Sequence, residues 1–321
     1  MSAVPESHKR QYRIIYELLW SKDPRIYVKD IASVLHVDPR TASRRIREAF
    51  ELGYIVGPQI RKRSYANMTE YMYFTNCKNP LEAYKRYSKD ENVLYHAVMA
   101  GFANLWVVSR KEIEVEGDIV LEGLRSDYYV SHAPDHSWET AKQVMQRKVE
   151  EFNLEEYTST GFIKNQWNKT IEWDIEFEKL YREFKYNLRK SLTPIMKKHL
   201  ISGQKIYEFL DNLFECCTIA TCYFPEGISL YDPYLFLFET DYPDFVIELF
   251  SELPTSSFFF QCSDKLFLRS YVERQFLRCE DLQIANIGQL YIPLLIYDLL
   301  KKGIIKSEEH AIIEYSWSKD L

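Results

Sequence analysis

The chain of 321 residues contains an internal repeat, and this repeat constrains the fold more than any other feature of the sequence. Residues 25–55 align without gaps to residues 189–219, and apolar residues occupy the same places in both copies. The matched pairs include Val28 and Leu192, Ile31 and Ile195, Ile46 and Leu210, and Phe50 and Phe214. Because buried positions must stay apolar in each copy, the repeat predicts one fold that is built twice.

Each copy begins with a pattern that is typical of a helix-turn-helix. In the first copy, apolar residues at helical spacing predict helices over residues 11–20 and 28–35. A third helix is expected over residues 39–51, because Asp38 is a good N-cap and Pro39 suits the first helical position. Residues 54–56 are then expected to form a wing strand, followed by a basic wing over residues 59–64. The first copy therefore predicts a winged helix-turn-helix.

The segments that follow each helix-turn-helix also match one another and predict a strand, a helix and two strands. In the second copy these elements are expected over residues 234–239, 244–253, 256–262 and 266–272. A helix near 287–302 and a strand near 304–315 complete a ferredoxin-like β-α-β-β-α-β order. In the first copy, the closing helix is expected over residues 137–152, after an inserted hairpin near 112–132.

These patterns predict an α+β chain of two tandem units, each a helix-turn-helix followed by a ferredoxin-like domain. The expected domains are residues 1–66, 67–165 with the inserted hairpin, 166–222 and 223–321. The third of them is expected to be a degenerate helix-turn-helix.

Charge is distributed unevenly along the chain. Residues 1–66 contain 13 Lys and Arg against 7 Asp and Glu, whereas the whole chain has 41 against 47 and a net charge of −6. The first 66 residues therefore carry about +6 and the remainder about −12. A basic N-terminal domain on an acidic body is typical of a nucleic-acid reader, and a solvated charged surface is the alternative explanation.

The third helix of the first copy separates its residues onto two faces. Its apolar face is expected to contain Ala42, Ile46, Ala49 and Phe50. Its outward face is expected to present Arg40, Thr41, Arg44 and Arg47 to a DNA major groove, flanked by Ser43. Arg61, Lys62 and Arg63 are expected to add phosphate contacts. An exposed basic helix with no nucleic-acid partner is the alternative.

The corresponding helix of the second copy has lost this chemistry. Arg40, Arg44, Arg45 and Arg47 are matched by Gln204, Glu208, Phe209 and Asp211. Carboxylates are repelled by a phosphate backbone, so this helix is expected to be a structural relic or a surface for a partner. Phe209 is expected to pack against another module.

The segment 28–55 resembles the N-terminal domain of the leucine-responsive regulatory protein/AsnC (Lrp/AsnC) family of bacterial and archaeal regulators. The resemblance lies in the Ile31-Ala32 pair, the turn from Leu35 to Val37, the run from Arg44 to Ile46, and the closing Gly53 and Ile55. Each ferredoxin-like half is similar to the effector and dimerisation domain of that family, the RAM domain, which resembles the ACT domain.

The resemblance implies a sequence-specific transcriptional regulator that binds double-stranded DNA mainly through the first helix-turn-helix. It implies self-association through the RAM-like domains and a small-molecule effector held between them. In this family two chains pair through their sheets, so the duplication is expected to let both halves pair inside one chain. The resemblance does not identify the effector, and no enzyme activity and no cofactor are expected from this interpretation.

Two other functions stay open at this point. Siroheme decarboxylases are similar to two units of the same family, so an enzyme of that kind on this fold is one alternative. A protein-interaction adaptor, in which the helix-turn-helix units are scaffolds, is the other.

Further sequence features carry less weight. His132 and His136 flank Pro134 and Asp135, and we expect a polar turn there, with a metal site as the less favoured interpretation. The six cysteines show no CxxC pair and are expected to be buried free thiols. Without an apolar leader or a long apolar run, the chain is expected to be cytoplasmic.

Overall fold

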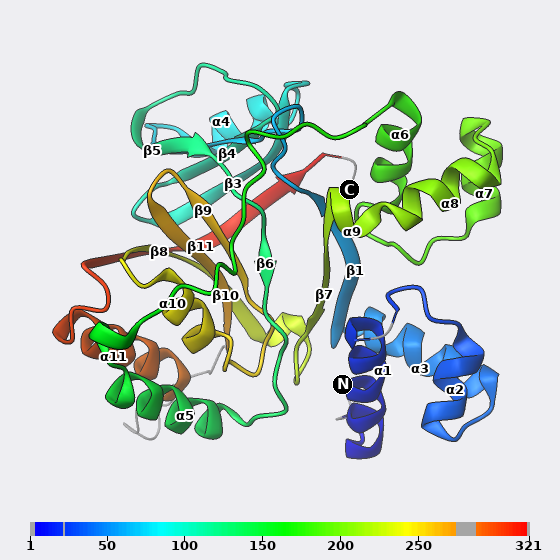
Figure 1. Ribbon diagram of the computed structural model, residues 1–321, viewed down its shortest axis with the longest axis horizontal. Coiled ribbons are helices and arrows are strands. Elements are labelled where there is room, and N and C mark those ends of the chain that lie inside the picture. Colours follow the sequence, from blue (N-terminus) through cyan, green and yellow to red (C-terminus); the bar gives the residue numbers. More distant parts are fainter. Residues whose placement is uncertain (1–3, 22, 274–286, 320–321) are drawn as a thin grey trace. The chain divides into compact units, whose positions relative to one another are not determined.

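The computed structural model describes residues 4–21, 23–273 and 287–319, and these form two compact units (Figure 1). The first unit comprises residues 1–62 and 172–230, and the second comprises residues 63–171 and 231–321. Each unit is therefore assembled from two segments, one from each half of the chain.

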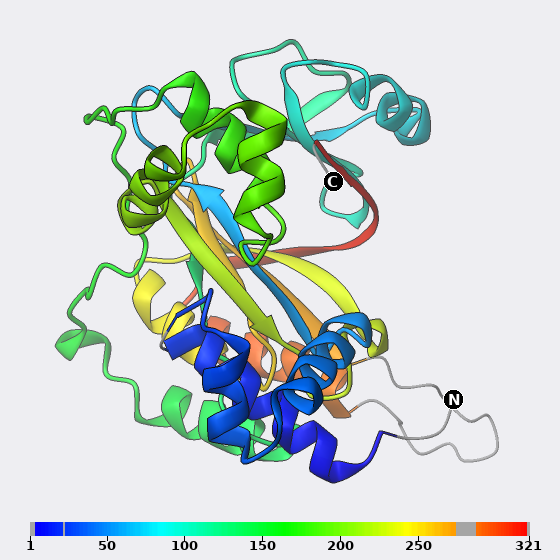
Figure 2. The same ribbon diagram turned by 90° about the vertical axis from the view of Figure 1, so that its right-hand side faces the viewer.

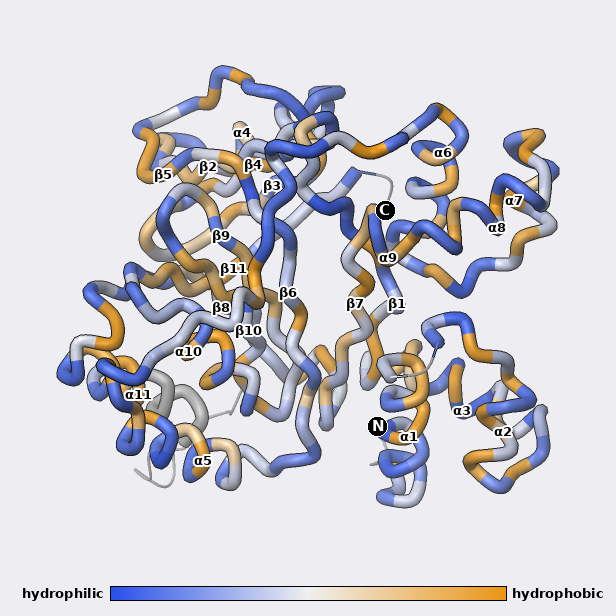
Figure 3. Tube along the Cα trace, viewed as in Figure 1, coloured by the Kyte–Doolittle hydropathy of each residue, from blue (hydrophilic) through white to orange (hydrophobic). Residues whose placement is uncertain are grey.

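The first unit contains the predicted first helix-turn-helix, which we call the first head. It consists of α1 (Glu6–Ser21), α2 (Val28–Leu35) and α3 (Pro39–Glu51), followed by strand β1 (Ile55–Lys62). The side chain of Asp38 accepts hydrogen bonds from the backbone N–H groups of Arg40 and Thr41, at 2.9 and 3.0 Å. The predicted N-cap is thus confirmed. In Figure 3, the three helices alternate between hydrophobic and hydrophilic residues, as expected for helices that share a small core.

The second head repeats this arrangement. It consists of α6 (Ile175–Phe184), α7 (Leu192–His199), α8 (Gly203–Asp211) and the short α9 (Leu213–Cys216), followed by strand β7 (Cys217–Tyr223). Ser202 caps α8 in the place of Asp38. The turn residues at matched positions, His36 and Leu200, both adopt the left-handed conformation, with φ of 52° and 55°. The structure therefore confirms the repeat down to the backbone of the turn.

The two heads are joined through their wing strands. Strands β1 and β7 pair with each other in an antiparallel two-stranded sheet, for example at Ile60 and Ile219. Figures 1 and 2 both place the first head at one end of this sheet and the second head at the other. The repeated segments thus pair inside one chain, as the duplication predicted.

The second unit is built around a nine-stranded antiparallel sheet with the order β5-β2-β4-β3-β11-β8-β10-β9-β6. The strands of the first half are β2 (Tyr71–Asn76), β3 (Val93–Gly101), β4 (Leu105–Ser109) and β5 (Asp118–Leu124). Those of the second half are β8 (Tyr231–Glu239), β9 (Phe258–Cys262), β10 (Lys265–Glu273) and β11 (Ser307–Ser318). The ninth is β6 (Tyr129–Val130). Each half has the spatial order of a ferredoxin-like sheet, so the predicted fold class is confirmed.

The sheet curls until its two ends approach each other. Strand β11 pairs with β3 on one side and with β8 on the other, and so joins the two halves at the centre. At the far ends, Arg125 forms an isolated antiparallel bridge with Cys262, and the Ser126 N–H donates to the Gln261 carbonyl at 2.9 Å. The sheet therefore has an interior face that is filled from both halves. The buried interior residues are Met72, Phe74, Ala97, Met99, Ala103, Trp106, Val108, Leu235, Leu237, Phe260, Cys262, Phe267, Ala311 and Ile313.

Helices cover the outer face of the sheet. Helix α4 (Pro80–Tyr87) lies on the first half, whereas α10 (Pro243–Phe250) and α11 (Ile287–Lys301) lie on the second. Helix α5 (Trp138–Glu151) packs against α10 and α11. The Lys302 ammonium group donates to the carbonyls of Val149 and Glu150 at the end of α5, at 2.6 Å in each case.

The first half closes differently from the sequence-based expectation. Helix α5 exists where a helix was expected, but it covers the second half, and β5 takes the fourth strand position with no helix before it. Strands β5 and β6 do not form the expected hairpin, because β5 pairs with β2 and β6 pairs with β9. The loop from β4 to β5 takes the place of the helix: its Ile113 N–H donates to the Tyr73 hydroxyl at 3.1 Å, and its Glu116 N–H donates to the Tyr87 hydroxyl at 3.1 Å. Among the described residues, no helix has the length and hydropathy that a membrane span requires.

Candidate functional sites

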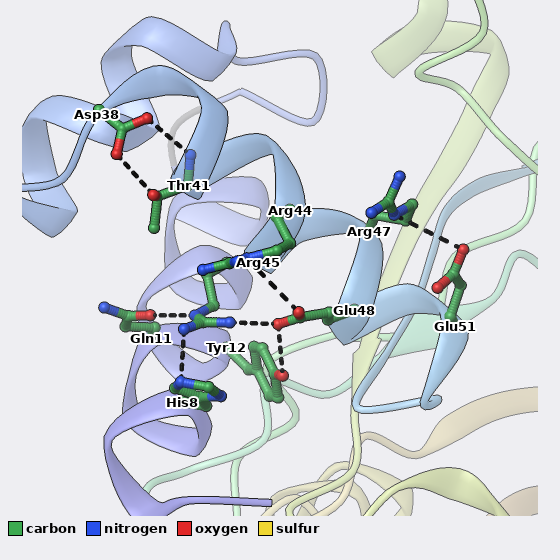
Figure 4. A network of polar contacts seen from close by, with 10 residues as sticks. All are labelled: His8, Gln11, Tyr12, Asp38, Thr41, Arg44, Arg45, Arg47, Glu48 and Glu51. Carbon is green, nitrogen blue, oxygen red and sulfur yellow. Dashed lines mark hydrogen bonds and ion pairs between the residues drawn. The ribbon is translucent and has the colours of Figure 1, made fainter.

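The predicted reading helix α3 is fixed to its head by a buried arginine (Figure 4). Arg45 is 7% exposed, and its guanidinium group donates to Gln11 at 2.7 Å and to Glu48 at 2.5 Å. The Tyr12 hydroxyl donates to the same carboxylate at 3.3 Å, and burial together with the charge of Glu48 raises the pKa of Tyr12 to about 12. Burial works against ionisation of Glu48, yet its bonds to Arg45 keep its pKa below the ordinary value. This network holds α3 by polar contacts between α1 and α3.

The opposite side of α3 forms a basic face, which we define as Arg40, Ser43, Arg44 and Arg47. All four residues are exposed, with the side chains of Arg44 and Arg47 54% and 69% accessible. Glu48 and Glu51 lie near these two guanidinium groups at 3.8 and 3.9 Å, which makes them loose surface pairs of little energetic consequence. The structure thus brings these predicted residues together on one accessible surface, and their contact with DNA stays a prediction.

Thr41 lies beside this face with its side chain already engaged. Its hydroxyl donates to the Asp38 carboxylate at 2.6 Å, as part of the N-cap. That hydrogen bond lowers the pKa of the exposed Asp38. A base contact by the Thr41 hydroxyl would have to replace or share this bond.

The three cations predicted to bind phosphate are held within the chain. Arg61 donates to the Ile60 carbonyl at 2.9 Å, and its guanidinium group lies 5.3 Å from the centre of the Tyr186 ring. The Lys62 ammonium group lies 2.5 Å from Glu178, over the rings of Trp173 and Tyr181. Arg63 pairs with the buried Asp127 at 3.0 Å. Tyr186, Glu178 and Asp127 come from segments that are distant in the chain, so the sequence gives no sign of these partners. A phosphate role for the three cations stays a prediction that this geometry disfavours.

The second head carries an acidic face in the place of the basic one. We define this face as Gln204, Tyr207, Glu208 and Asp211 on α8, all of which are exposed. Lys205, the remaining cation, lies 2.8 Å from Asp174 and 3.1 Å from Glu208. The expectation that Phe209 packs against another module is wrong: Phe209 is fully buried in its own head, against Phe177 and Phe184.

A second candidate site lies on the interior face of the curled sheet. Residues that are opposite each other on neighbouring strands share a face, so the partners of interior residues also point inward. By this rule Arg269, opposite the interior residue Leu235, and Ser316, opposite the interior residue Ala97, face the interior. Ser316, at this end of β11, is exposed.

Aromatic rings and two arginines lie near this interior face. The Tyr95 ring meets the Trp106 ring edge to face at 4.8 Å, and Trp106 stacks on Phe260 at 6.0 Å. The guanidinium group of Arg125, which is fully buried, lies 4.2 Å from the centre of the Tyr128 ring and donates to Glu70 at 2.9 Å. Arg269 lies 5.6 Å from the centre of the Tyr271 ring.

Two hydrogen-bond donors of this interior site stand out. Within the described residues, neither Trp106 Nε1 nor the Tyr95 hydroxyl has a hydrogen-bond partner of good geometry, although both atoms are buried. Burial raises the pKa of Tyr95, while Arg269 and Ser316 act on it in the opposite direction. Buried donors normally have an acceptor, so this face is suited to a ligand that supplies acceptor atoms.

Sequence analysis did not identify this interior site. Alternation along β3 and β10 shows that Tyr95 shares a face with Ala97, and Arg269 with Phe267. It does not show that these two faces meet across the curled sheet.

Neither histidine segment gathers metal ligands. His96 is fully buried on the outer face of β3, between the rings of Tyr84 and Trp317, and burial lowers its pKa to about 4. His136 lies in irregular backbone before α5, as expected for a polar turn, 3.9 Å from Glu252. In the described part of the chain, no three His, Cys, Asp or Glu residues gather as a metal site would require.

Comparison with known proteins adds a structural relationship. No family model matches the chain, and no curated protein matches its sequence. The chain is similar to the crystal structure of the siroheme decarboxylase NirDL, with a TM-score of 0.50 and 12% identity over 96% of this chain and 92% of that one. A second structure of NirDL, in complex with an iron-uroporphyrin III analogue, matches at 11% identity with a TM-score of 0.48 over the same shares.

The first of these similarities shows a shared fold and corrects one expectation. The chain was expected not to be an enzyme, but the solved structure that it resembles over nearly its whole length is that of a decarboxylase. The expectation rested on the arginine-rich α3 helix and on the lack of a recognisable His/Arg motif in the ferredoxin-like halves of the sequence. A head of this kind does not determine what the curled sheet does.

Proposed function

We propose that the curled sheet binds a carboxylated planar substrate of the tetrapyrrole class and that the chain is a decarboxylase acting on it. The observation that carries this proposal is the pair of buried donors, Trp106 Nε1 and the Tyr95 hydroxyl, that make no hydrogen bond of good geometry with the described residues. A substrate carboxylate supplies such acceptors. The similarity to a siroheme decarboxylase supports the substrate class through the shared fold alone.

The lining of the site suits both parts of such a substrate. Arg269 places a cation on the interior face next to Tyr95, where it favours a bound carboxylate. The rings of Trp106, Tyr128 and Phe260 form an apolar wall for the planar body of the macrocycle. Arg125 is already neutralised by Glu70, so we assign it to holding the Tyr128 ring in place.

The chemistry needs an acid as well as a binding site. Decarboxylation breaks the bond between a side-chain carbon and its carboxylate, releases carbon dioxide, and leaves an electron pair on the carbon that must take up a proton. Tyr95 remains protonated because burial raises its pKa, so it is available as the proton donor. We assign Tyr95 this role and Trp106 the role of orienting the carboxylate.

The test is anaerobic titration of the full chain with siroheme, followed by absorption, and mass analysis of the recovered tetrapyrrole for loss of carbon dioxide. Trp106→Phe keeps the ring and removes the donor, so binding is expected to weaken by about tenfold, the usual effect of one hydrogen bond to a charged group. Tyr95→Phe removes the other donor as well as the proposed proton source, so it is expected to weaken binding by a similar factor and to abolish product. A chain that neither shifts the absorption of siroheme nor yields product would refute the proposal.

A second candidate function is DNA binding by the first head. The observation in its favour is the basic face of α3, where three arginines lie exposed on one side of the helix. Selection of genomic fragments, followed by a salt titration, tests it with Arg44→Glu as the variant. Enrichment of a discrete motif that is lost in the variant supports the candidate, and an absence of enrichment at low salt removes it.

A further inference from the structure

We propose that two copies of this chain associate head to head, with the basic face of α3 in one copy against the acidic face of α8 in the other. This contact lies on the first unit and does not depend on the chemistry of the curled sheet. In α8 the arginines of α3 that are predicted to contact DNA are replaced by uncharged or acidic residues. The proposed contact assigns this face of the second head a binding partner.

The first argument is charge at matched positions. Arg44 and Glu208 occupy the same place in the two heads, as do Arg47 and Asp211. Both helices follow a capped turn of the same conformation, so the two charges are spaced alike on each. The side chains of Arg44 and Glu208 are 54% and 50% accessible, and thus available to a partner. Surfaces of equal spacing and opposite sign are electrostatically complementary.

The second argument is apolar exposure beside the carboxylates. Tyr207 is 59% exposed in the place of Ser43, and Leu200 is 90% exposed in the place of His36. Tyrosine is enriched at protein interfaces, where its ring is buried and its hydroxyl finds a partner. Neither exposed apolar side chains nor carboxylates suit a phosphate backbone, so the acidic face favours a protein over a nucleic acid.

The third argument is geometry. Within one chain the two heads are in contact through Arg25 and Arg189, but among the described residues no ion pair joins the basic face of α3 to the acidic face of α8. Because the heads are copies of each other, two chains can form the contact twice, α3 to α8 and α8 to α3. Two equal contacts close a symmetric dimer and leave no unmatched face.

Reversing the charges of the two faces tests the proposed contact, with the dimer dissociation constant of the full chain measured by sedimentation. In variant A, Arg44→Glu and Arg47→Glu make the α3 face acidic, and in variant B, Glu208→Arg and Asp211→Arg make the α8 face basic. Each variant alone opposes like charges, so its dimer dissociation constant is expected to rise by at least about tenfold. An equimolar mixture restores opposite charges at both contacts and is expected to form an A–B dimer of nearly native affinity.

The mixture also separates the proposed contact from a folding defect, since a misfolded variant does not regain affinity when it meets its counterpart. The matched control is Lys85→Glu on the exposed surface of α4, which changes the net charge without touching either head and is expected to leave the dimer intact. A native chain that stays monomeric across the micromolar range overturns the proposal. So does a dimer whose affinity is the same in variant A, variant B and their mixture.

Discussion

Arg25 and Arg189 each donate hydrogen bonds to the backbone carbonyls on both sides of the other. The guanidinium group of Arg25 donates to the carbonyls of Leu188 and Lys190, the residues on either side of Arg189. Arg189 donates to the carbonyls of Pro24 and Ile26, the residues on either side of Arg25, at 3.0 and 2.8 Å. The two arginines occupy matched positions of the repeat, so this exchange is the local signature of a dimer-like pairing inside one chain.

Because each arginine satisfies two backbone carbonyls of the other head, we expect Arg189→Met to lower the free energy of unfolding by about 2 kcal/mol. Burial lowers the pKa of both arginines, and their mutual repulsion is relieved in the variant, which limits the loss. Arg10→Met, an exposed change on α1, is the control. Urea unfolding measures both, and equal stability of the two variants would show that these hydrogen bonds contribute little.

We expect Lys62→Met to lower the free energy of unfolding, because the Lys62 ammonium group lies 2.5 Å from the Glu178 carboxylate. The pKa of Glu178 is held at about 2, below its ordinary 4.5. The stabilisation is therefore fully present above pH 4.5 and is lost as the pH falls towards 2. Unfolding measured at pH 3 and pH 7 should show the difference between Lys62→Met and the native chain shrink in acid. A constant difference would contradict this.

His96 predicts a second pH dependence with its own range. Its pKa is about 4 in the folded chain because burial disfavours the charged ring, whereas the unfolded chain protonates it near 6.5. The unfolded state thus binds more protons between these values, so stability falls as the pH decreases from 6.5 to 4. We expect His96→Phe to flatten this slope while keeping the stacking on Trp317. A slope that is unchanged in the variant would assign the pH dependence to other groups.

Asp244 anchors the segment that follows α5. Its carboxylate accepts hydrogen bonds from the N–H groups of Thr160, Gly161 and Phe162 at 2.8, 2.8 and 3.1 Å. We expect Asp244→Asn to release this segment, because the amide has one acceptor oxygen where the carboxylate has two. Limited trypsin digestion should then cut after the exposed Lys164 faster than in the native chain. Asp241→Asn, which changes an exposed carboxylate nearby, should leave the rate unaltered.

The sequence allowed the heads to be predicted well, for reasons that lie in local chemistry. Asp38 and Pro39 determine where α3 begins, and the alternation of apolar residues determines which face is buried. The same local chemistry places a helix over α5 correctly and says nothing about its partners. Its position on α10 and α11 depends on contacts across about 100 residues, such as that of Lys148 with Glu252.

The interior site lay beyond prediction for a related reason. Tyr95 and Arg269 are far apart in the chain and meet because β11 joins β3 to β8. The hydrophobic periodicity of a strand shows which of its faces is buried, but it does not show which other strand lies beside its edge. Phe209 shows the same limit. It occupies the same position in the repeat as Arg45, and both side chains are buried. In the sequence, Arg45 belongs to a run of arginines, so a phenylalanine in its place was expected to lie on the surface.

The central place of β11 has a consequence for folding during synthesis. Strand β3 is synthesised about 200 residues before β11, so the edge of β3 that pairs with β11 has no partner strand during that interval. Completion of the sheet is thus tied to nearly complete synthesis. Translation that stops before residue 307 would leave both half-sheets with open edges, so truncated products should be prone to aggregation and quality-control proteolysis.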